Sequence, residues 1–383
     1  MFSVGLIIIS NGQALSQVSK FRLCYAVCCL LWALLGFVVG QIRTLRRYGW
    51  LANMAVWLNL LVMFISMGAF AHSPPNYSIA VLGSAGSVVD PTTITPDPNT
   101  GVYPPVIHYN GLPNPNSLVG SINGLMQAVY AYGGAQLFVE FMAEMRRPRD
   151  FLKAMWFAQF LIWAVYLSYG CFLYYFQGQY SYQISYQGVS SYGLQTLCNM
   201  IAVFSAIIAA GLYGNIGIKV LYNNIFIDFF KFPELNTHSG KVIWAITVPI
   251  YWTIAFVIAA AIPDFFGLVS VMAAFTLVQF TYSFPPLLAL GYCIKRAAMQ
   301  DGEGFDPATG HVVRHDSGIK RWIRGFFGGP TKDILFNIWN LVYMLGAFTT
   351  AGFGAYAAIQ GMIDVFENPQ VNAFVCKSPL NLS

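Results

Sequence analysis

The chain has 383 residues, of which 57% are hydrophobic and only 9% are charged, and its mean hydropathy is +0.57. This composition excludes a soluble globular protein, and apolar stretches of bilayer length indicate a polytopic membrane protein. The formal net charge of +5 does not indicate a nucleic-acid partner, because the basic residues lie in short loops between apolar stretches. The sequence therefore predicts an all-α protein whose surroundings are the lipid bilayer.

Nine apolar stretches are predicted to be membrane-spanning helices. In chain order they are Phe2–Val18, Phe21–Ile42, Tyr48–Ala71, Ser117–Met145, Phe151–Gln177, Gly193–Phe226, Lys241–Ile262, Phe265–Ile294 and Ile334–Val365. They divide the chain into residues 1–72 with three spans, an outer or lumenal loop at 73–116, residues 117–294 with five spans, a cytoplasmic loop at 295–333, and residues 334–383 with the last span and tail. Both loops are rich in polar and turn-forming residues, so we expect the first to be irregular and Gln300–Gly318 to be a mobile linker.

The positively charged residues fall on one side of these spans. Residues 73–116 and 178–192 contain no Lys or Arg, whereas 17 of the 20 basic residues lie in or beside the alternate loops. Because cytoplasmic loops are enriched in Lys and Arg, we predict that the alternate loops are cytoplasmic. Only Lys20, Arg22 and Lys377 fall on the other face. An odd number of spans then places the N-terminus inside and the C-terminus outside.

The sequence Tyr130-Ala131-Tyr132-Gly133-Gly134 interrupts the fourth span near its middle. Two adjacent glycines favour a break in a membrane helix, and a break persists only where protein or a cavity meets the exposed backbone groups. Broken spans with a ligand site at the break are typical of secondary transporters. In the eighth span, Pro285-Pro286 predicts a second break.

Residues suited to intramembrane catalysis or metal binding are not clustered in the sequence. The five histidines lie in loops or at span ends, and no HExxH pair or nucleophile elbow occurs. The seven cysteines show no paired spacing, and six lie within or at the ends of apolar runs, where a free cysteine acts as a small hydrophobic residue. We therefore predict that the protein is not an enzyme and has no cofactor, metal site or disulfide framework.

The segment AYGGAQLFVEFMAEMRRPRDFLKAM, residues 131–155, resembles the sixth transmembrane helix of the amino acid/auxin permease family, and so does its continuation into the aromatic span that ends in FQGQY. The segments AAGLYGNIGIKVLYNNIF, VPIYWTIAFVIAAAIPDFFGL and FTYSFPPLLALGYCI resemble helices eight, nine and ten. The resemblance covers nearly the whole chain in order, and the fungal neutral amino acid permeases are most similar.

This resemblance implies a leucine-transporter-like bundle with two inverted five-helix repeats and an eleventh helix. Only three spans precede the Tyr-Gly-Gly helix, so the first two helices of the first repeat are missing, including the second broken helix. We favour an incomplete gene model over a shortened, inactive relative. The latter would be a non-transporting protein with a structural or binding role in the membrane.

By the same resemblance, the substrate is an amino acid bound at the break, with backbone amides facing its carboxylate and carbonyls facing its ammonium group. The candidate substrate-binding residues lie at the break and on two other spans: Tyr130, Ala131, Tyr132, Gly133, Gly134, Asn11, Gly211 and Asn215. For the glycines the alternative is close helix packing, and for the tyrosines it is aromatic core packing.

A carboxylate within a membrane is costly, by about 2.5–3.5 kcal/mol at the bilayer centre, so it must pair, face water or bind a proton. Glu140 is therefore the proton-coupling candidate, with an interfacial ion pair as the alternative; for Glu144 we favour the ion pair. Asn76, in the sequon Asn76-Tyr77-Ser78, is the glycosylation candidate.

The sequence thus predicts a secondary active transporter of neutral amino acids, coupled to protons and working by alternating access. We expect it in the plasma membrane rather than the vacuolar membrane. The residues do not indicate an oligomeric state.

Overall fold

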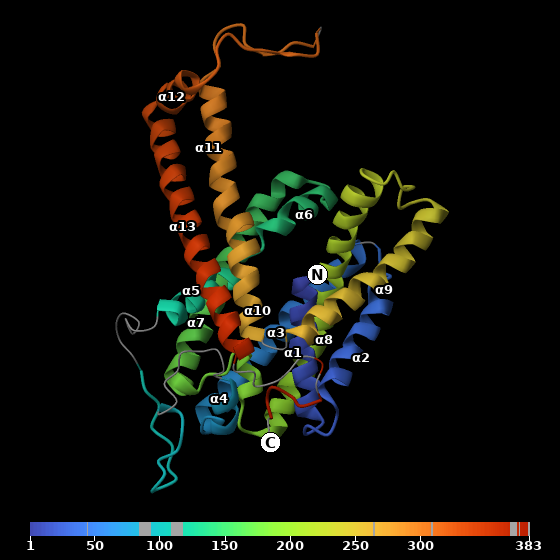
Figure 1. Cartoon of the computed structure of the whole chain (residues 1–383), viewed down its shortest axis with the longest axis vertical. Coiled ribbons are helices and arrows are strands. Elements are labelled where there is room, and N and C mark those ends of the chain that lie inside the picture. The colour runs from blue at the N-terminus through green and yellow to red at the C-terminus, as the bar shows by residue number, and fades with distance from the viewer. Residues whose placement is uncertain are drawn as a thin grey trace. The chain divides into compact units, whose positions relative to one another are not determined.

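The computed structural model of the chain describes residues 1–43, 45–83, 93–108, 118–262, 265–307, 309–367, 374 and 376–381, and these are mostly helical (Figure 1). The α-helices are α1 Phe2–Val18, α2 Tyr25–Val39, α3 Leu45–His72, α4 Tyr77–Gly83, α5 Leu118–Ala131, α6 Phe138–Glu144, α7 Phe151–Gln177, α8 Tyr192–Leu221, α9 His238–Ala261, α10 Phe265–Met272, α11 Phe284–Ala297, α12 Ile319–Phe327 and α13 Thr331–Glu367. The strands β1 Gly304–Phe305 and β2 Val312–Val313 form an antiparallel hairpin.

Shorter segments extend or join these helices. The 3₁₀ turns are η2 Ala135–Leu137, η3 Pro148–Asp150, η4 Gly178–Tyr180 and η5 Ser185–Gly188. The π-helical segments are η6 Tyr222–Ile227, η7 Ala273–Leu277 and η8 Gln279–Ser283.

Helices occupy each of the nine ranges predicted to span the membrane. Within the residues that the structure describes, six helical stretches are long and apolar enough to cross a bilayer: Gly49–His72, Pro148–Tyr180, Tyr192–Ile227, His238–Ala261, Phe265–Ala297 and Thr331–Ile363. Helices α1 and α2 are apolar but shorter, with 17 and 15 residues. An all-α polytopic membrane protein is therefore confirmed, and the number of crossings stays a prediction.

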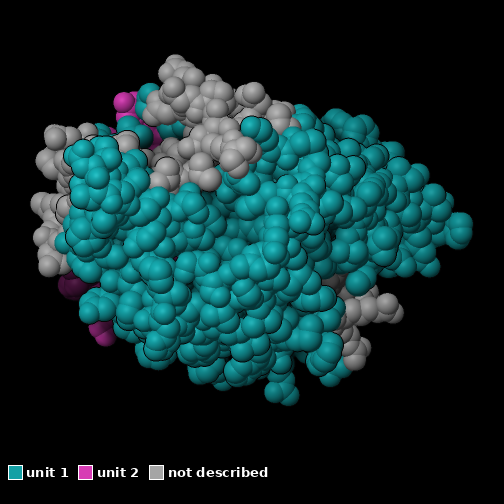
Figure 2. All heavy atoms as spheres, turned by 90° about the horizontal axis from the view of Figure 1, so that it is seen from below, with its two compact units in different colours: residues 1–120, 139–269, 360–383 teal, residues 121–138, 270–359 magenta. Residues whose placement is uncertain are grey.

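The described residues divide into two compact units, shown in different colours in Figure 2. Unit 1 comprises residues 1–120, 139–269 and 360–383. Unit 2 comprises residues 121–138 and 270–359, and so contains most of α5 and most of α13.

In unit 1, α8 packs against α1 and α3, and α1 and α2 both pack against α9. The contact between α2 and α9 depends on a small residue, because a Cβ at Gly36 would overlap the Trp252 indole ring. Small residues at such positions let membrane helices approach closely. By contrast α7 leaves Trp156, Phe157 and Phe160 about 70% exposed, as suits a helix that faces lipid.

The core of unit 2 joins α5 to the π-helical stretch after α10 and to α13. Met126 is fully buried and touches Gly354, where a Cβ would come within 2.5 Å of the methionine sulfur. Asn123 Nδ2 donates to the Ala357 carbonyl at 3.4 Å, and Gln127 Nε2 donates to Ser270 Oγ at 2.9 Å. The unit is thus held by both apolar packing and interhelical hydrogen bonds.

The predicted break at Pro285-Pro286 is wrong. The helical backbone runs from Phe265 to Ala297, and the two prolines stand at the start of α11, directly after the π-helical segment η8. Proline is tolerated in the first turn of a helix, where its missing N–H matters least. The wider π turns therefore replace the break that the prolines predict.

The prediction that the protein has no disulfide framework is also wrong, because Cys24 and Cys376 form a disulfide bond. Cys24 directly precedes α2, and Cys376 lies in the C-terminal tail. Next to the disulfide, the Tyr25 N–H donates a hydrogen bond to the Cys376 carbonyl at 2.9 Å. The partners are 352 residues apart, so local cysteine spacing gave no sign of them. The other five cysteines are free.

Both polar loops contain more structure than expected. Helix α4 lies in the 73–116 loop, and the Gln300–Gly318 stretch contains the β1–β2 hairpin. Glu303 and Asp316 in that stretch form ion pairs with Arg321. The stretch predicted to be a mobile linker thus contains a hairpin and two acidic residues that pair with Arg321.

Candidate functional site

The break predicted in the fourth span is present. Helix α5 ends at Ala131, and the helical path resumes as η2 at Ala135 before continuing into α6. At the end of α5 the hydrogen bonds tighten, with Gly133 N–H donating to the Tyr130 carbonyl at 3.1 Å. At the new start, Leu137 N–H donates to the Gly134 carbonyl at 3.0 Å. The regular i→i−4 ladder is interrupted between these points, which leaves backbone groups free for other partners.

The two glycines at the break have different surroundings. A Cβ added to Gly133 would come within 2.9 Å of Leu277 Cδ2, so this residue packs closely against η7. A Cβ added to Gly134 would meet no heavy atom of the described residues within 4 Å. The space at the break therefore lies at Gly134, whereas Gly133 serves close packing.

Tyr130 and Tyr132 also have different surroundings. Tyr130 packs against the buried cluster that includes Val129 and Leu277. Tyr132 lines a cavity of about 460 Å³, whose other walls come from α5, the π-helical stretch and α13. Its lining residues are Leu125, Ala128, Val129, Tyr132, Val278, Tyr282, Tyr343, Gly346, Ala347 and Thr350, and none of them is charged.

One polar residue at the break was not predicted from the sequence. Gln136 lies in η2, and its Oε1 atom is buried with no hydrogen-bond partner among the described residues. A buried acceptor left unpaired is costly, so Gln136 Oε1 is suited to accept a hydrogen bond from a polar group at the break. The sequence did contain a signal for this residue, because a glutamine stands inside an apolar span two residues after the glycines.

In unit 1, the predicted residue Asn11 lines a small cavity of about 10 Å³ between α1, α2, α8 and α9. Trp32 and Trp252 also line it, and their indole Nε1 atoms are buried without a partner among the described residues. A cavity of this size holds at most one water molecule. It is too small for an amino acid.

The predicted residues on α8 lie in the interior of unit 1. Gly211 is buried next to Ala210, which lines the same cavity as Asn11. Asn215 is fully buried, and its Nδ2 donates to the Ile42 carbonyl just after α2. The candidates thus form two sets: Asn11, Gly211 and Asn215 in unit 1, and the residues of the break in unit 2.

A network of buried amides at the C-terminal end of α1 and the N-terminal end of α8 was also not predicted. Asn199 Nδ2 donates to Gln17 Oε1 at 2.9 Å, and Gln17 Nε2 donates to the Gln187 carbonyl at 3.1 Å. Gln195 Nε2 donates to the same carbonyl at 2.7 Å. Polar side chains at this depth in membrane helices commonly join neighbouring helices, and here they join α1, η5 and α8.

The acidic candidates lie on α6, and the glycosylation candidate lies just before α4. Glu140 is partly exposed, and no ion pair to it occurs among the described residues. The side chain of Glu144 lies outside the described residues. Asn76 Nδ2 donates to the Val189 carbonyl at 3.3 Å, and Ser78 Oγ donates to Asn76 Oδ1 at 2.9 Å. A glycan on Asn76 would therefore have to displace the bond to Val189.

The helical fold is that of a multi-pass membrane protein with an interrupted helix. More narrowly, the chain belongs to the transmembrane amino acid transporter protein family, whose family model matches residues 105–302. The matched range includes the broken helix and the π-helical stretch that packs against it. This is a family of transporters and not of enzymes, which agrees with the prediction that the protein is not an enzyme.

Two fungal relatives carry similar sequences. A "transmembrane transporter" of Gibberella moniliformis (strain M3125 / FGSC 7600) is 25% identical over 323 residues, which cover 84% of this chain and 61% of the relative. A "transmembrane transporter" of Fusarium pseudograminearum (strain CS3096) is 24% identical over 286 residues, covering 74% of this chain and 54% of the relative. The chain thus spans little more than half the length of these relatives. No solved structure matches the chain.

Proposed function

We propose that this protein is a secondary active transporter that moves neutral amino acids together with protons. Family membership supports amino acid transport. The observation that carries the proposal is the break between Ala131 and Ala135, with open space at Gly134 and a tyrosine-lined cavity beside Tyr132. The repeats are proposed to be those of a leucine-transporter-like bundle, with α5 opening the second one.

The chemistry of the break suits a zwitterion with an uncharged side chain. Interrupted backbone offers amides to a carboxylate and carbonyls to an ammonium group, and Gln136 Oε1 adds an acceptor for the ammonium. The cavity beside Tyr132 has uncharged walls, so it favours an apolar or aromatic side chain over a charged one. Tyr130 is not among the residues that line the cavity and supports the site through packing.

Proton coupling is proposed to use Glu140. Its position on α6 places it one short helical segment after the break. Protonation would favour substrate binding from the outer side, and rocking of the helices would then expose the site to the cytoplasm. The substrate can drive this change only by binding the two states with different affinity.

The test is uptake of radiolabelled amino acids by the purified chain in proteoliposomes, at two external pH values. The proposal expects uptake of neutral amino acids that rises on the acidic side and is abolished by a protonophore. In Glu140→Gln the dependence on external pH should disappear, whereas Asp150→Asn, on the exposed pair with Lys153, should retain it. Specific binding without flux would instead favour the non-transporting alternative. Microscopy of a tagged chain would test the plasma membrane as its location.

A further inference from the structure

Helix α12, in the cytoplasmic loop between α11 and α13, has one apolar face and one basic face. Ile319, Ile323 and Phe327 follow each other at intervals of four residues, with Trp322 and Phe326 beside them on the same side. The basic residues Lys320, Arg321 and Arg324 lie on the other side. Low overall hydrophobicity with strong segregation of this kind is typical of helices that lie in a membrane interface.

The apolar face of α12 is open. Ile319 is 77% exposed, Ile323 is 55% exposed and Phe327 is 60% exposed. Trp322 beside them is 49% exposed. Contiguous exposed apolar side chains on a protein surface usually mark a contact with another molecule or with a membrane.

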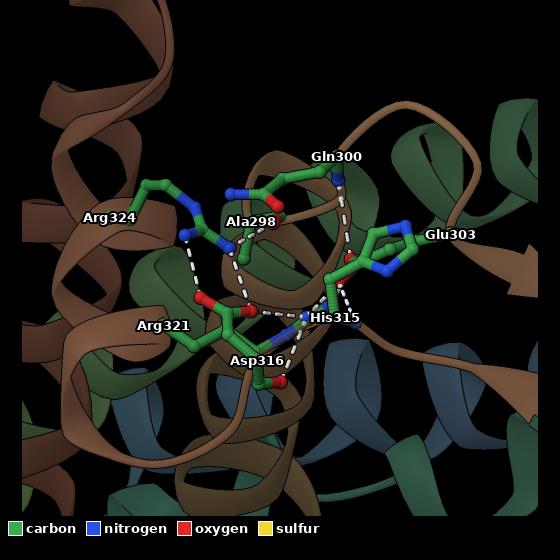
Figure 3. Close-up of polar contacts among 7 residues, drawn as sticks. All are labelled: Ala298, Gln300, Glu303, His315, Asp316, Arg321 and Arg324. Carbon is green, nitrogen blue, oxygen red and sulfur yellow. Dashed lines mark hydrogen bonds and ion pairs between the residues drawn. The ribbon is translucent and has the colours of Figure 1, made fainter.

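The rotation of α12 is fixed by ion pairs on its basic face (Figure 3). Arg321 makes a two-pronged contact with Glu303, with Nη1 to Oε1 at 2.8 Å and Nη2 to Oε2 at 2.7 Å. Arg321 Nη1 and Arg324 Nη1 also contact the Asp316 carboxylate, at 2.8 and 2.6 Å. Bidentate pairs of this type are the strong and directional ones, so α12 is held with its apolar face turned away from the cluster.

The same helix is fastened to the cytoplasmic end of α11. Arg324 Nη2 donates to the Ala298 carbonyl at 2.9 Å, directly after the last turn of α11. Gly325 is buried there, since a Cβ would overlap the Ile294 carbonyl and come within 3.0 Å of Ala298 Cβ. Helix α12 therefore packs against the C-terminal end of α11.

The attachment of α12 to α11 and α13 indicates what covers its apolar face. Helices α11 and α13 lie in two of the candidate membrane spans, and only residues 328–330 separate α12 from α13 (Figure 1). A segment tied this closely to two spans stays at the level of the lipid headgroups. Exposed cations surround it at the ends of all three helices, namely Lys295, Arg296, Lys320 and Lys332, and such residues favour the anionic cytoplasmic leaflet.

We propose that α12 is an interfacial helix that docks on the cytoplasmic phospholipid surface through Ile319, Trp322, Ile323 and Phe327, with the Glu303–Arg321–Asp316–Arg324 cluster setting its rotation. Its partner is thus lipid, and neither a soluble protein nor another part of this chain. The loop acts as an anchor that holds the cytoplasmic ends of α11 and α13 at a fixed depth.

Photo-cross-linking in nanodiscs tests this proposal. The photoreactive residue p-benzoylphenylalanine replaces Ile323 in one variant and, as the control, Arg314 in another, since Arg314 lines the cavity on the basic side of α12. We expect lipid adducts by mass spectrometry at position 323 in phosphatidylcholine discs, an increase when phosphatidylserine is added, and none at position 314. Equal adducts at both positions, or adducts only to protein at 323, would overturn the proposal.

A second pair of variants tests the role of the ion-pair cluster. Arg321→Gln removes the contacts with Glu303 and Asp316, while Lys320→Gln removes an exposed charge from the same helix without touching the cluster. Combined with the photoreactive residue at 323, Arg321→Gln should lose most of the lipid adduct and Lys320→Gln should retain it. An unchanged adduct in Arg321→Gln would show that the cluster does not orient the helix.

Discussion

Cys24 and Cys376 form a disulfide that joins the loop before α2 to the C-terminal tail, with 4.2 Å between the Cα atoms. Both residues lie in segments that the distribution of basic residues places outside the cytoplasm. Disulfides persist in oxidising compartments and are rare in the cytosol. The predicted orientation therefore puts both cysteines in a compartment where a disulfide can persist.

The first prediction concerns this bond. Cys24→Ser should lower the free energy of unfolding by about 2–4 kcal/mol, because the bond restricts the unfolded chain. Cys171→Ser, at an exposed free cysteine, should have little effect. The measurement is thermal unfolding in detergent by nanoscale fluorimetry. In intact cells carrying the Cys171→Ser background, an impermeant maleimide should label Cys24 and Cys376 only after an impermeant reductant; labelling of these two cysteines without reductant would contradict the bond.

A second prediction concerns the contact of α2 with α9. Gly36→Ala should destabilise unit 1, since the new Cβ would overlap the Trp252 ring and overpacking typically costs about 1–3 kcal/mol. Gly214→Ala is the matched control, because its Cβ would lie 3.5 Å from the same indole, an ordinary contact. The melting temperatures of both variants are the measurement, and equal values would show that α2 shifts freely.

A third prediction separates packing from ligand binding at the break. Gly133→Ala should reduce stability, and it should cost less when introduced into a Leu277→Ala background, which lacks the side chain that the new Cβ meets but is itself destabilised by the lost core packing. Gly134→Ala should leave the melting temperature unchanged but reduce amino acid uptake, because its Cβ enters open space that the proposed substrate occupies. Normal uptake by Gly134→Ala would place the substrate elsewhere.

The unpaired acceptor at Gln136 leads to a fourth prediction. Gln136→Leu should raise the KM for uptake about tenfold, as expected for the loss of one hydrogen bond to a charged group. Gln127→Leu, whose amide instead bonds to Ser270, should alter stability more than KM. Substrate protection of the Gln136→Leu variant against heat, compared with wild type, provides an independent measure of binding.

The fifth prediction concerns the acidic residues of the Glu303–Arg321–Asp316–Arg324 cluster. The hydrogen bonds from Arg321 and from the His315 N–H hold the pKa of Glu303 well below its ordinary value of 4.5. A carboxyl with a lowered pKa stabilises the fold above its unfolded pKa, and this stabilisation is lost as the pH falls toward the folded value. The loop should therefore resist trypsin to a constant degree at any pH above about 5. Glu303→Gln should raise cleavage after Arg314 and Lys320 throughout that range, whereas Glu234→Gln, in another loop, should not.

The long apolar runs of the sequence predicted the positions of the helices well. Helix α1 and helix α7 have the predicted bounds, since uninterrupted apolar runs specify membrane helices almost by themselves. The break after Ala131 was also predictable, because adjacent glycines weaken a helix wherever they occur. The break predicted at Pro285-Pro286 does not occur, because the backbone before Pro285 forms π-helical turns. Such turns depend on packing in three dimensions and could not be predicted from the sequence.

The candidate site was predictable only in part. Gly133 and Gly134 look alike in the sequence, and only the neighbouring Leu277 distinguishes their roles. Tyr282 and Tyr343 are far from Tyr132 along the chain and share its cavity solely through folding. The disulfide shows the same limit, because contacts between distant segments leave no local trace.

The Cys24–Cys376 bond also has a consequence for biosynthesis. Cys24 is synthesised long before its partner, which lies 352 residues further along the chain. The bond can close only after the tail has been synthesised. A bonded Cys24 therefore marks a chain that has been translated as far as its tail, and a product terminated before Cys376 would carry Cys24 as a free thiol.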